Sequence, residues 1–100
     1  MSQAVELIRF RVTEPRASTF VEGRSQVDAA MTTLAGFVNS ELIQVSGEEW
    51  LLIVRWESRE AVTAAQAITA NMQVISDWIA KADQFLSFDT ADVRYQSSAT

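Results

Sequence analysis

The segment WLLIVRW, residues 50–56, has the composition of a β-strand but not the alternation of a strand with one exposed face. Successive side chains of a strand point to opposite faces of its sheet, so a half-exposed strand alternates apolar and polar residues. Here one face carries a tryptophan at each end, and the other carries Leu51 and Ile53 with a single Arg55. This pattern predicts a strand that is covered on both faces.

Two neighbouring segments also have the character of strands. Residues 4–12 (AVELIRFRV) place apolar side chains at the even positions from 8 to 12, with Arg9 and Arg11 on the opposite face. Residues 37–46 (FVNSELIQVS) are joined to WLLIVRW through the tight turn Ser46-Gly47-Glu48. These two consecutive strands are therefore predicted to form a hairpin.

The last strand is predicted at residues 85–96 (FLSFDTADVRYQ). Its alternation fails between Asp89 and Asp92, where we expect a β-bulge. Residues 97–100 (SSAT) are small and polar, and we expect them to be a disordered tail.

Between the first two strands the apolar period changes from two to that of a helix. One helical stripe is formed by Phe20, Val27, Met31 and Leu34. It predicts a helix from about Pro15 to Leu34, with Gly36 in the left-handed conformation that follows a helix end. Thr19 and Glu22 have the spacing of a capping box, whereas Pro15 favours an earlier start.

The second helical region follows the strand WLLIVRW and begins at Ser58, a residue suited to a helix N-cap. Its first apolar stripe consists of Ala61, Ala64, Ala65 and Ile68. Asn71 is expected to break the helix. The stripe resumes in a second helical piece that ends near Lys81, at Ile75, Trp78, Ile79 and Ala82.

The predicted order of elements is β-α-β-β-α-β, which is the ferredoxin-like arrangement of the α+β class. Right-handed crossovers place the helices of both halves on one face of a four-stranded antiparallel sheet. The other face would expose Leu51, Ile53 and their neighbours, a large patch for a soluble monomer. A second copy of the same sheet, related by a two-fold axis, is the simplest cover. We therefore expect residues 1–96 to form one domain of a homodimer whose sheets pack face to face.

Several classes of function lack the residues they need. The chain of 100 residues has no cysteine and no histidine, so thiolate nucleophiles, imidazole bases and the commonest metal ligands are missing. The net charge is −5 and the eight basic residues are scattered, which argues against a nucleic-acid partner. No signal pattern opens the chain, and no run approaches the ~18 apolar residues of a membrane span. We expect a cytoplasmic protein with no metal and no membrane partner.

Two segments resemble those of a known family. The run GFVNSELIQ and the strand EEWLLIVRWESREA, in which Trp-Glu-Ser leads into an alanine-rich helix, are similar to the antibiotic biosynthesis monooxygenase family of the dimeric α+β barrel superfamily. The resemblance covers residues 4–96 and implies the fold and the homodimer. It also implies an oxygenase that oxidises phenolic substrates with O2 and without metal or flavin.

The same family has a haem-degrading branch, which binds haem through a histidine and also uses an asparagine and a tryptophan. The histidine position falls near Trp78, the tryptophan position near Ile68, and the asparagine position at Ile8 or Arg9. None of the three residue types matches. The resemblance therefore disfavours haem degradation for this chain.

A cofactor-free oxygenase must hold a flat aromatic in a dry pocket, accept one proton and stabilise an anion with fixed positive charge. We expect such a pocket between the helices and the sheet. The candidate ligand-binding residues are Phe10, Phe20, Phe37, Trp56 and Tyr95. The candidate catalytic residues are Arg9, Trp78 and Asn71, with Arg11, Asn39 and Arg55 as further polar candidates.

Several of these candidates also have a purely structural interpretation. Trp78 and Trp56 fit core positions, Asn71 fits a helix break, and Tyr95 fits a packed residue at a strand end. Three hypotheses therefore stay open. The chain is a cofactor-independent oxygenase of a small aromatic or quinol-type metabolite, a non-catalytic binder of a small apolar ligand, or a structural dimer whose core is filled by its own side chains.

The arginines of the bare sheet face have an electrostatic alternative. Arg9 and Arg11 share one face of the first strand, where pairing with Glu41 or Glu57 at the dimer seam competes with binding of an anionic ligand. Arg55 is expected at the rim of the same seam, paired with a carboxylate.

Overall fold

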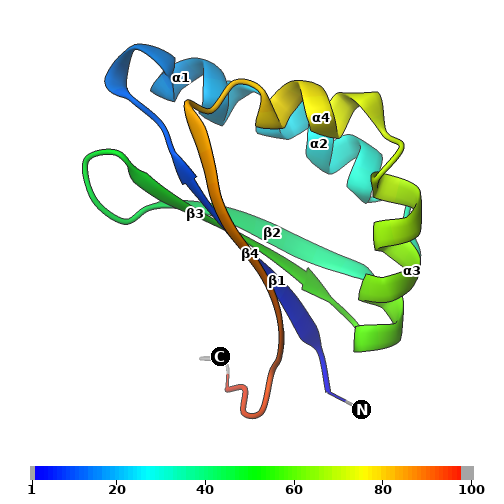
Figure 1. Ribbon diagram of the computed structural model, residues 1–100. Helices are drawn as coiled ribbons and strands as arrows, with labels where there is room; N and C mark the ends of the chain where they lie inside the picture. Colours follow the sequence, from blue (N-terminus) through cyan, green and yellow to red (C-terminus); the bar gives the residue numbers. More distant parts are fainter. Residues whose placement is uncertain (1, 98–100) are drawn as a thin grey trace.

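The strands form one antiparallel sheet, and the helices lie over a single face of it (Figure 1). The computed structural model describes residues 2–97. The elements are β1 (Ala4–Arg11), α1 (Glu14–Glu22), α2 (Arg24–Met31), β2 (Phe37–Gln44), β3 (Glu49–Trp56), α3 (Arg59–Thr69), α4 (Gln73–Ile79) and β4 (Gln84–Asp92). The strand order is β2-β3-β1-β4. This confirms the predicted ferredoxin-like fold, with a pair of helices in each of the two helical regions.

The first helical region is divided into α1 and α2 at Gly23. A Cβ atom at this position would lie 2.8 Å from Cδ1 of Trp78, which is too close for a carbon contact. Trp78 of α4 can therefore pack against the backbone here only because residue 23 is a glycine. The earlier start that Pro15 favours is confirmed and the alternative capping box at Thr19 is wrong, because α1 begins at Glu14 with Pro15 in its first turn. The predicted apolar stripe is buried at Phe20, Val27 and Met31.

The second helical region begins where predicted but turns a different side to the sheet. Ser58 caps α3, since its Oγ accepts a hydrogen bond from the backbone N–H of Ala61 at 3.1 Å. The buried side chains of α3 are Val62 and Ala65, whereas Ile68 is 52 % exposed. The prediction that Ile68 belongs to the core is wrong. The side of α3 that faces the sheet is made of positions 62, 65, 66 and 69, which have the same helical spacing as the predicted stripe. It buries Val62, whereas the predicted stripe would bury the smaller Ala61.

The edge strand β4 contains a bulge. Its register against β1 shifts by one residue at Leu86, not between residues 89 and 92 where the bulge was predicted. Because a bulge inserts one extra residue, Phe85 and Phe88 face the same side of the sheet although they are three positions apart. Both phenylalanines therefore point toward the helices.

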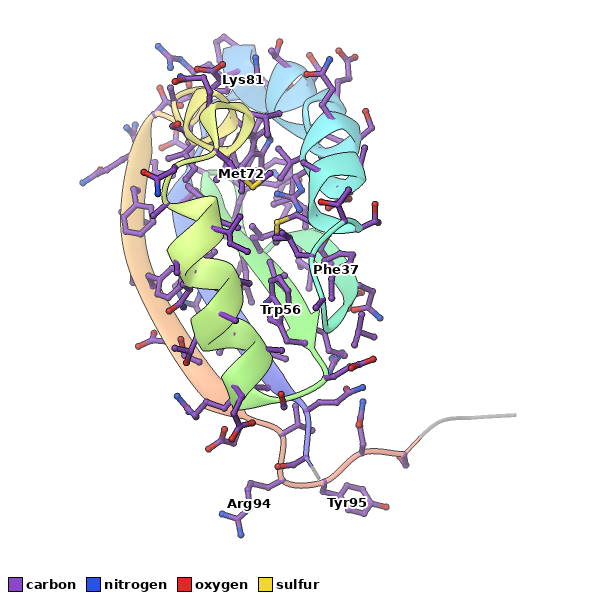
Figure 2. The ribbon with its side chains drawn as sticks, turned by 90° about the vertical axis from the view of Figure 1, so that its right-hand side faces the viewer. Phe37, Trp56, Met72, Lys81, Arg94 and Tyr95 are labelled. Atoms are coloured by element: carbon purple, nitrogen blue, oxygen red, sulfur yellow. The ribbon has the colours of Figure 1, made fainter. Side chains whose placement is uncertain are left out.

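Beyond β4 the chain runs beside the N-terminal residues. The N–H of Val93 donates to the carbonyl of Gln3 at 2.9 Å, and the Gln96 side chain donates to that of Gln3 at 3.0 Å. Tyr95 is 85 % exposed and projects from this tail, away from the helices (Figure 2). The predicted disorder of residues 98–100 lies outside the described residues.

The face of the sheet that meets the helices, here called the inner face, carries the core. The strand β3 contributes Trp50, Leu52, Val54 and Trp56, all buried as its pattern predicts. Above the sheet, the rings of Phe20 and Trp78 stack with centroids 4.3 Å apart. Phe10 meets both rings edge-on at 5.3 Å. This aromatic cluster holds α1 and α4 against β1.

The opposite face, here called the outer face, has no helix over it within residues 2–97 (Figure 1). Its apolar side chains come from all four strands: Val5, Leu7, Ile43, Leu51, Ile53 and Ala91. Leu51 and Ile53 are half-buried by their neighbours in the protomer alone. The strand WLLIVRW is thus covered by helices on one side only.

The charged groups of the outer face pair differently from the prediction. The ion pairs are Arg9–Glu49 at 2.7 Å and Arg11–Glu48 at 3.0 Å. Within the protomer neither arginine pairs with Glu41 or Glu57, because the β1–β3 register puts Arg11 opposite Glu49 and brings the acidic turn beside both arginines, and pairing across a dimer seam stays a prediction. Arg55 has no ion-pair partner among residues 2–97, so its predicted carboxylate partner is not in the described part of the protomer.

Candidate functional site

A pocket of about 300 Å³, here called the inner pocket, lies between the inner face of the sheet and the helices α2, α3 and α4. Its aromatic walls are Phe10, Trp78, Phe85 and Phe88. Phe85 and Phe88 are 48 % and 43 % exposed, which places the opening beside the edge strand β4. The polar side chains of the pocket are Glu6, Arg24, Gln66, Thr69 and Ser76. A mostly apolar cavity with a few polar groups is typical of a small-molecule site, and this volume is at the lower end of the usual range.

Glu6 is the acidic side chain of the inner pocket. It lies on the inner face of β1 and is only 7 % exposed. Its Oε1 accepts a hydrogen bond from the indole N–H of Trp56 at 2.8 Å, and its Oε2 accepts one from the amide of Gln66 at 3.1 Å. The carboxylate is therefore held from β3 and from α3, the helix that lies beside Trp56 in Figure 2.

Arg24 is the buried cation of the pocket, at the start of α2. Its Nη2 donates to Oδ1 of Asp28 at 2.6 Å and to Oγ of Ser40 at 3.1 Å. Its guanidinium lies over the ring of Trp78, with Cζ 4.5 Å from the centroid. Burial lowers the pKa of Arg24, while the charge and hydrogen bond of Asp28 act in the opposite direction. A guanidinium stays protonated in proteins, so the pocket contains a permanent cation whose charge is partly offset by its ion pair with Asp28.

Arg24 also retains hydrogen-bonding capacity. A guanidinium has five N–H donors, and the two bonds to Asp28 and Ser40 both come from Nη2. Within residues 2–97, Nε and Nη1 donate to no acceptor. An anionic group in the pocket would find free donors on this side chain.

Trp78 contributes its ring to the wall of the pocket, but it offers a ligand no hydrogen-bond donor. Its indole N–H donates to the backbone carbonyl of Phe20 at 2.8 Å, so this donor is already used. The ring itself is 2 % exposed and packs between Phe20 and the Arg24 guanidinium. Trp78 therefore contributes only apolar surface to the wall of the pocket.

The structure brings some of the predicted site residues together. Phe10 and Trp78 line the inner pocket. Phe20 and Trp56 are fully buried behind its walls, and Phe37 meets Trp56 edge-on at 5.6 Å. Figure 2 shows Trp56 in the interior beside α3, with Phe37 near it on β2. A direct role in ligand binding stays a prediction for Phe10 and Trp78.

The other predicted residues lie away from the inner pocket. Arg9 extends from the outer face, Asn71 is exposed at the break between α3 and α4, and Tyr95 is in the tail. Of the further polar candidates, Arg11, Asn39 and Arg55 also belong to the outer face. Their expected place in a pocket between helices and sheet is wrong, since the strand register fixes them on the other side of the sheet.

Sequence reasoning missed the charged residues that do line the pocket, although the patterns contained them. Glu6 follows the same period of two as Ile8 and Phe10, which marks a carboxylate on a buried strand face. Arg24 lies four residues after Phe20 and three before Val27, on the apolar stripe of the helix. A charged residue at a buried position was the available signal for the site.

The arrangement defines the chemistry that the pocket could support. A flat ring fits against Trp78 and Phe10, a carboxylate can accept a proton, and a guanidinium can stabilise an anion. Within residues 2–97 no three acidic side chains gather in a way that could hold a metal ion. In the same part of the chain, no helix has the length and apolar character needed to cross a membrane.

A family model described as antibiotic biosynthesis monooxygenase matches residues 4–70. This span runs from β1 through α3, and it contains the three residues Glu6, Arg24 and Gln66. A search of curated protein sequences found no match.

Solved structures of similar fold cover nearly the whole chain. A mutant of SnoaB, described as a cofactor-independent oxygenase from Streptomyces nogalater, is 16 % identical with a TM-score of 0.70 over 98 % of this chain and 97 % of its own. A haem-free haem-degrading protein from Mycobacterium tuberculosis is 19 % identical, with a TM-score of 0.70 over 98 % of each chain. A dimeric ferredoxin-like protein from an uncultured marine organism is 11 % identical, with a TM-score of 0.74 over 100 % of this chain and 95 % of its own. At these identities the likeness establishes the fold.

The bond between Trp56 and Glu6 can be measured with a matched pair of variants. Trp50 and Trp56 both lie on the inner face of β3 and are 7 % and 0 % exposed, but the buried Nε1 of Trp50 has no partner within residues 2–97. We expect Trp56→Phe to lower the free energy of unfolding by about 1–3 kcal/mol more than Trp50→Phe, because only the former leaves a buried carboxylate oxygen without its donor. Urea unfolding of both variants measures the difference. Equal losses would show that the bond contributes nothing beyond the packing of the ring.

Proposed function

The chain belongs to the antibiotic biosynthesis monooxygenase family, and from this membership we propose that its inner pocket oxidises a small, electron-rich aromatic compound with O2 without a cofactor. The observation that carries the proposal is the combination of a buried carboxylate and a buried guanidinium in one apolar pocket. Of the similar structures, SnoaB is described as a cofactor-independent oxygenase, which supports the same reaction class.

The size of the pocket favours a substrate with one or two rings. A volume of about 300 Å³ is at the lower end of the range for ligand sites, which reaches ~1,000 Å³. The walls supply aromatic contacts from Phe10, Trp78, Phe85 and Phe88, of which the last two are the most accessible, and the few polar groups select a ring that carries hydroxyl or carbonyl oxygens. Phenols and quinols of this size are the proposed substrate class.

The proposed reaction is balanced with O2 as the sole oxidant. For a naphthol, loss of the hydroxyl proton gives an anion whose charge reaches the ring carbon opposite the oxygen. This carbon transfers an electron to O2 and then combines with the resulting superoxide to form a peroxide. Loss of the hydrogen at that carbon, together with the terminal peroxide oxygen as hydroxide, gives a quinone and one water. The substrate thus supplies the electrons that reduce one oxygen atom.

The residues of the inner pocket would stabilise the anion and exclude water from it. The guanidinium of Arg24 offers free donors on Nε and Nη1 to the oxygen that becomes negative. Because Arg24 is 8 % exposed and Trp78 is 2 % exposed, this electrostatic interaction takes place largely away from bulk water, where it is strongest. Apolar walls also limit the loss of the peroxide intermediate to side reactions.

A non-catalytic binder of the same kind of ligand is the second candidate, since the same pocket would serve it. The third hypothesis, a core filled by its own side chains, is disfavoured by the open volume beneath α3 and α4.

We also propose that the outer face is covered by a second copy of this chain. All four strands contribute apolar side chains to this face, the charged groups Arg9, Arg11 and Arg55 lie on it as well, and self-association through a two-fold axis would bury its apolar part on both copies. One of the similar structures is described as a dimeric ferredoxin-like protein, which supports this arrangement. Arg55 would then have access to a carboxylate of the partner.

The oxygenase proposal is tested by O2 uptake with 1-naphthol in metal-free buffer containing a chelator. We expect the wild type to consume one O2 for each naphthoquinone formed, above the rate without protein. Arg24→Met should lower kcat/KM about 100-fold, because it removes the positive charge from the developing anion. The control Arg59→Met changes an exposed arginine at the start of α3 and should leave the rate unchanged.

The outcomes separate the candidates. Absence of O2 uptake across a panel of phenols and quinols, combined with a ligand-dependent rise in melting temperature, would replace the oxygenase by the binder. Absence of both would contradict any function for the inner pocket.

The homodimer is tested with two substitutions of the same type. Ile53→Asp places a charge in the centre of the outer face and should yield a monomer or unfolded protein, because the charge would be buried at the interface. Ile68→Asp changes an isoleucine that is 52 % exposed on α3 and should leave the dimer intact. Light scattering during gel filtration gives the mass of each. A wild type that stays a folded monomer at micromolar concentration would contradict the proposal.

A further inference from the structure

Glu6 is the only buried acidic side chain within residues 2–97. It forms no ion pair with a lysine or arginine in this part of the chain, although burying an unpaired carboxylate is costly. A glutamine at this position could accept the hydrogen bond of Trp56 without that cost. Packing alone therefore does not explain an acid at this position.

The hydrogen bonds of Glu6 leave room for a proton. Each oxygen of an ionised carboxylate has two lone-pair sites, and one site on each oxygen is occupied, by Trp56 on Oε1 and by Gln66 on Oε2. Both donors are neutral and come from β3 and α3, so they fix the orientation of the carboxylate while leaving lone pairs free. Since Glu6 lines the inner pocket, these lone pairs are available to a ligand there.

We propose that Glu6 is the catalytic base of the inner pocket, which takes the hydroxyl proton of the aromatic substrate and later returns it. The proposal rests on the proposed oxygenase function and assigns its proton transfer. A carboxylate is the acceptor that the pocket offers, because the chain has no histidine and the pocket's other ionisable side chain, Arg24, is a cation.

The proton transfers balance over one turnover. The O–H bond of the phenol breaks, its proton forms a new O–H bond on Glu6, and the electron pair stays on the substrate as the phenolate. After the ring carbon has bound O2, the carboxyl proton moves to the terminal oxygen of the peroxide anion. The hydroperoxide then loses water as the ring carbon gives up its hydrogen, and Glu6 is again a carboxylate.

Trp56 and Gln66 are positioning residues in this assignment. They touch Glu6 rather than the substrate, and they hold the carboxylate on the pocket side of β1. Arg24 completes the site from α2, on the helical side of the pocket, where it can stabilise the anion that Glu6 generates.

The test uses Glu6→Gln in the full chain, with Glu57→Gln as the control at an exposed position. Glutamine is nearly isosteric with glutamate, and its carbonyl can still accept from Trp56 if the Gln66 amide turns over. We expect binding of 1-naphthol without O2 to change less than threefold. At pH 7 the O2-dependent rate should fall about 100-fold or more, as for loss of a general base.

The pH dependence distinguishes a base from a structural residue. A phenol ionises by itself as the pH approaches its own pKa, about 10 for a tyrosine-like phenol. The ratio of the wild-type rate to the Glu6→Gln rate should therefore shrink between pH 7 and pH 10. A ratio that stays constant over this range, or a Glu6→Gln rate equal to the wild type at pH 7, would overturn the assignment.

Two further outcomes are decisive. If Glu6→Gln does not melt cooperatively, Glu6→Asp replaces it, since it keeps the acid but draws it back from the pocket by one methylene. A Glu6→Asp rate equal to the wild type would overturn the assignment, and a reduced rate with intact naphthol binding would support it. A wild type that takes up no O2 overturns the oxygenase function and the role of Glu6 with it, whereas uptake that is insensitive to Glu6 overturns only the role of Glu6.

Discussion

The carboxylate of Glu6 links three elements around the inner pocket. Its two hydrogen bonds connect β1 to Trp56 on β3 and to Gln66 on α3. The strands would pair without these hydrogen bonds. The helix α3, however, would then be held on the sheet only by its two buried side chains, Val62 and Ala65. Because a buried polar group has a strong requirement for its partners, these bonds set where α3 lies and thereby set one side of the inner pocket.

The same sheet produces two different surfaces because the helices cover only one of them. On the inner face, the bulge at Leu86 turns both Phe85 and Phe88 toward the helices and carries the aromatic lining to the edge of the sheet. On the outer face, β1 and β3 align Leu7 with Ile53 and leave an apolar surface that the protomer does not cover. The proposed ligand chemistry and the proposed self-association therefore use opposite faces, and a change on one need not disturb the other.

The fold could be predicted from the sequence because its signals are local and repeated. The alternation along β1, the apolar run of β3, the stripe of Phe20, Val27 and Met31, and the cap at Ser58 all depend on residues close together in the chain. The buried side of α3 could not be predicted in the same way. The stripe that begins at Ala61 and the one that begins at Val62 have equal spacing, and the many alanines of this helix give both a similar apolar character. The bulge position likewise depends on the pairing of β4 with a strand more than 70 residues away in the sequence.

The candidate site was predicted only in outline. Its location between helices and sheet and its walls at Phe10 and Trp78 agree with the structure, but the predicted polar residues, such as Arg9, lie on the outer face, whereas the charged residues of the pocket are buried. The central claim, that an aromatic ligand lies against Trp78 and near Glu6, is tested most directly by NMR of the three indole N–H groups, assigned with Trp→Phe variants. In a titration with 1-naphthol without O2, the signals of Trp78 and of Trp56, whose N–H donates to Glu6, should shift together and saturate, while that of Trp50 stays in place. Shifts absent at saturating ligand, or confined to Trp50, would contradict it.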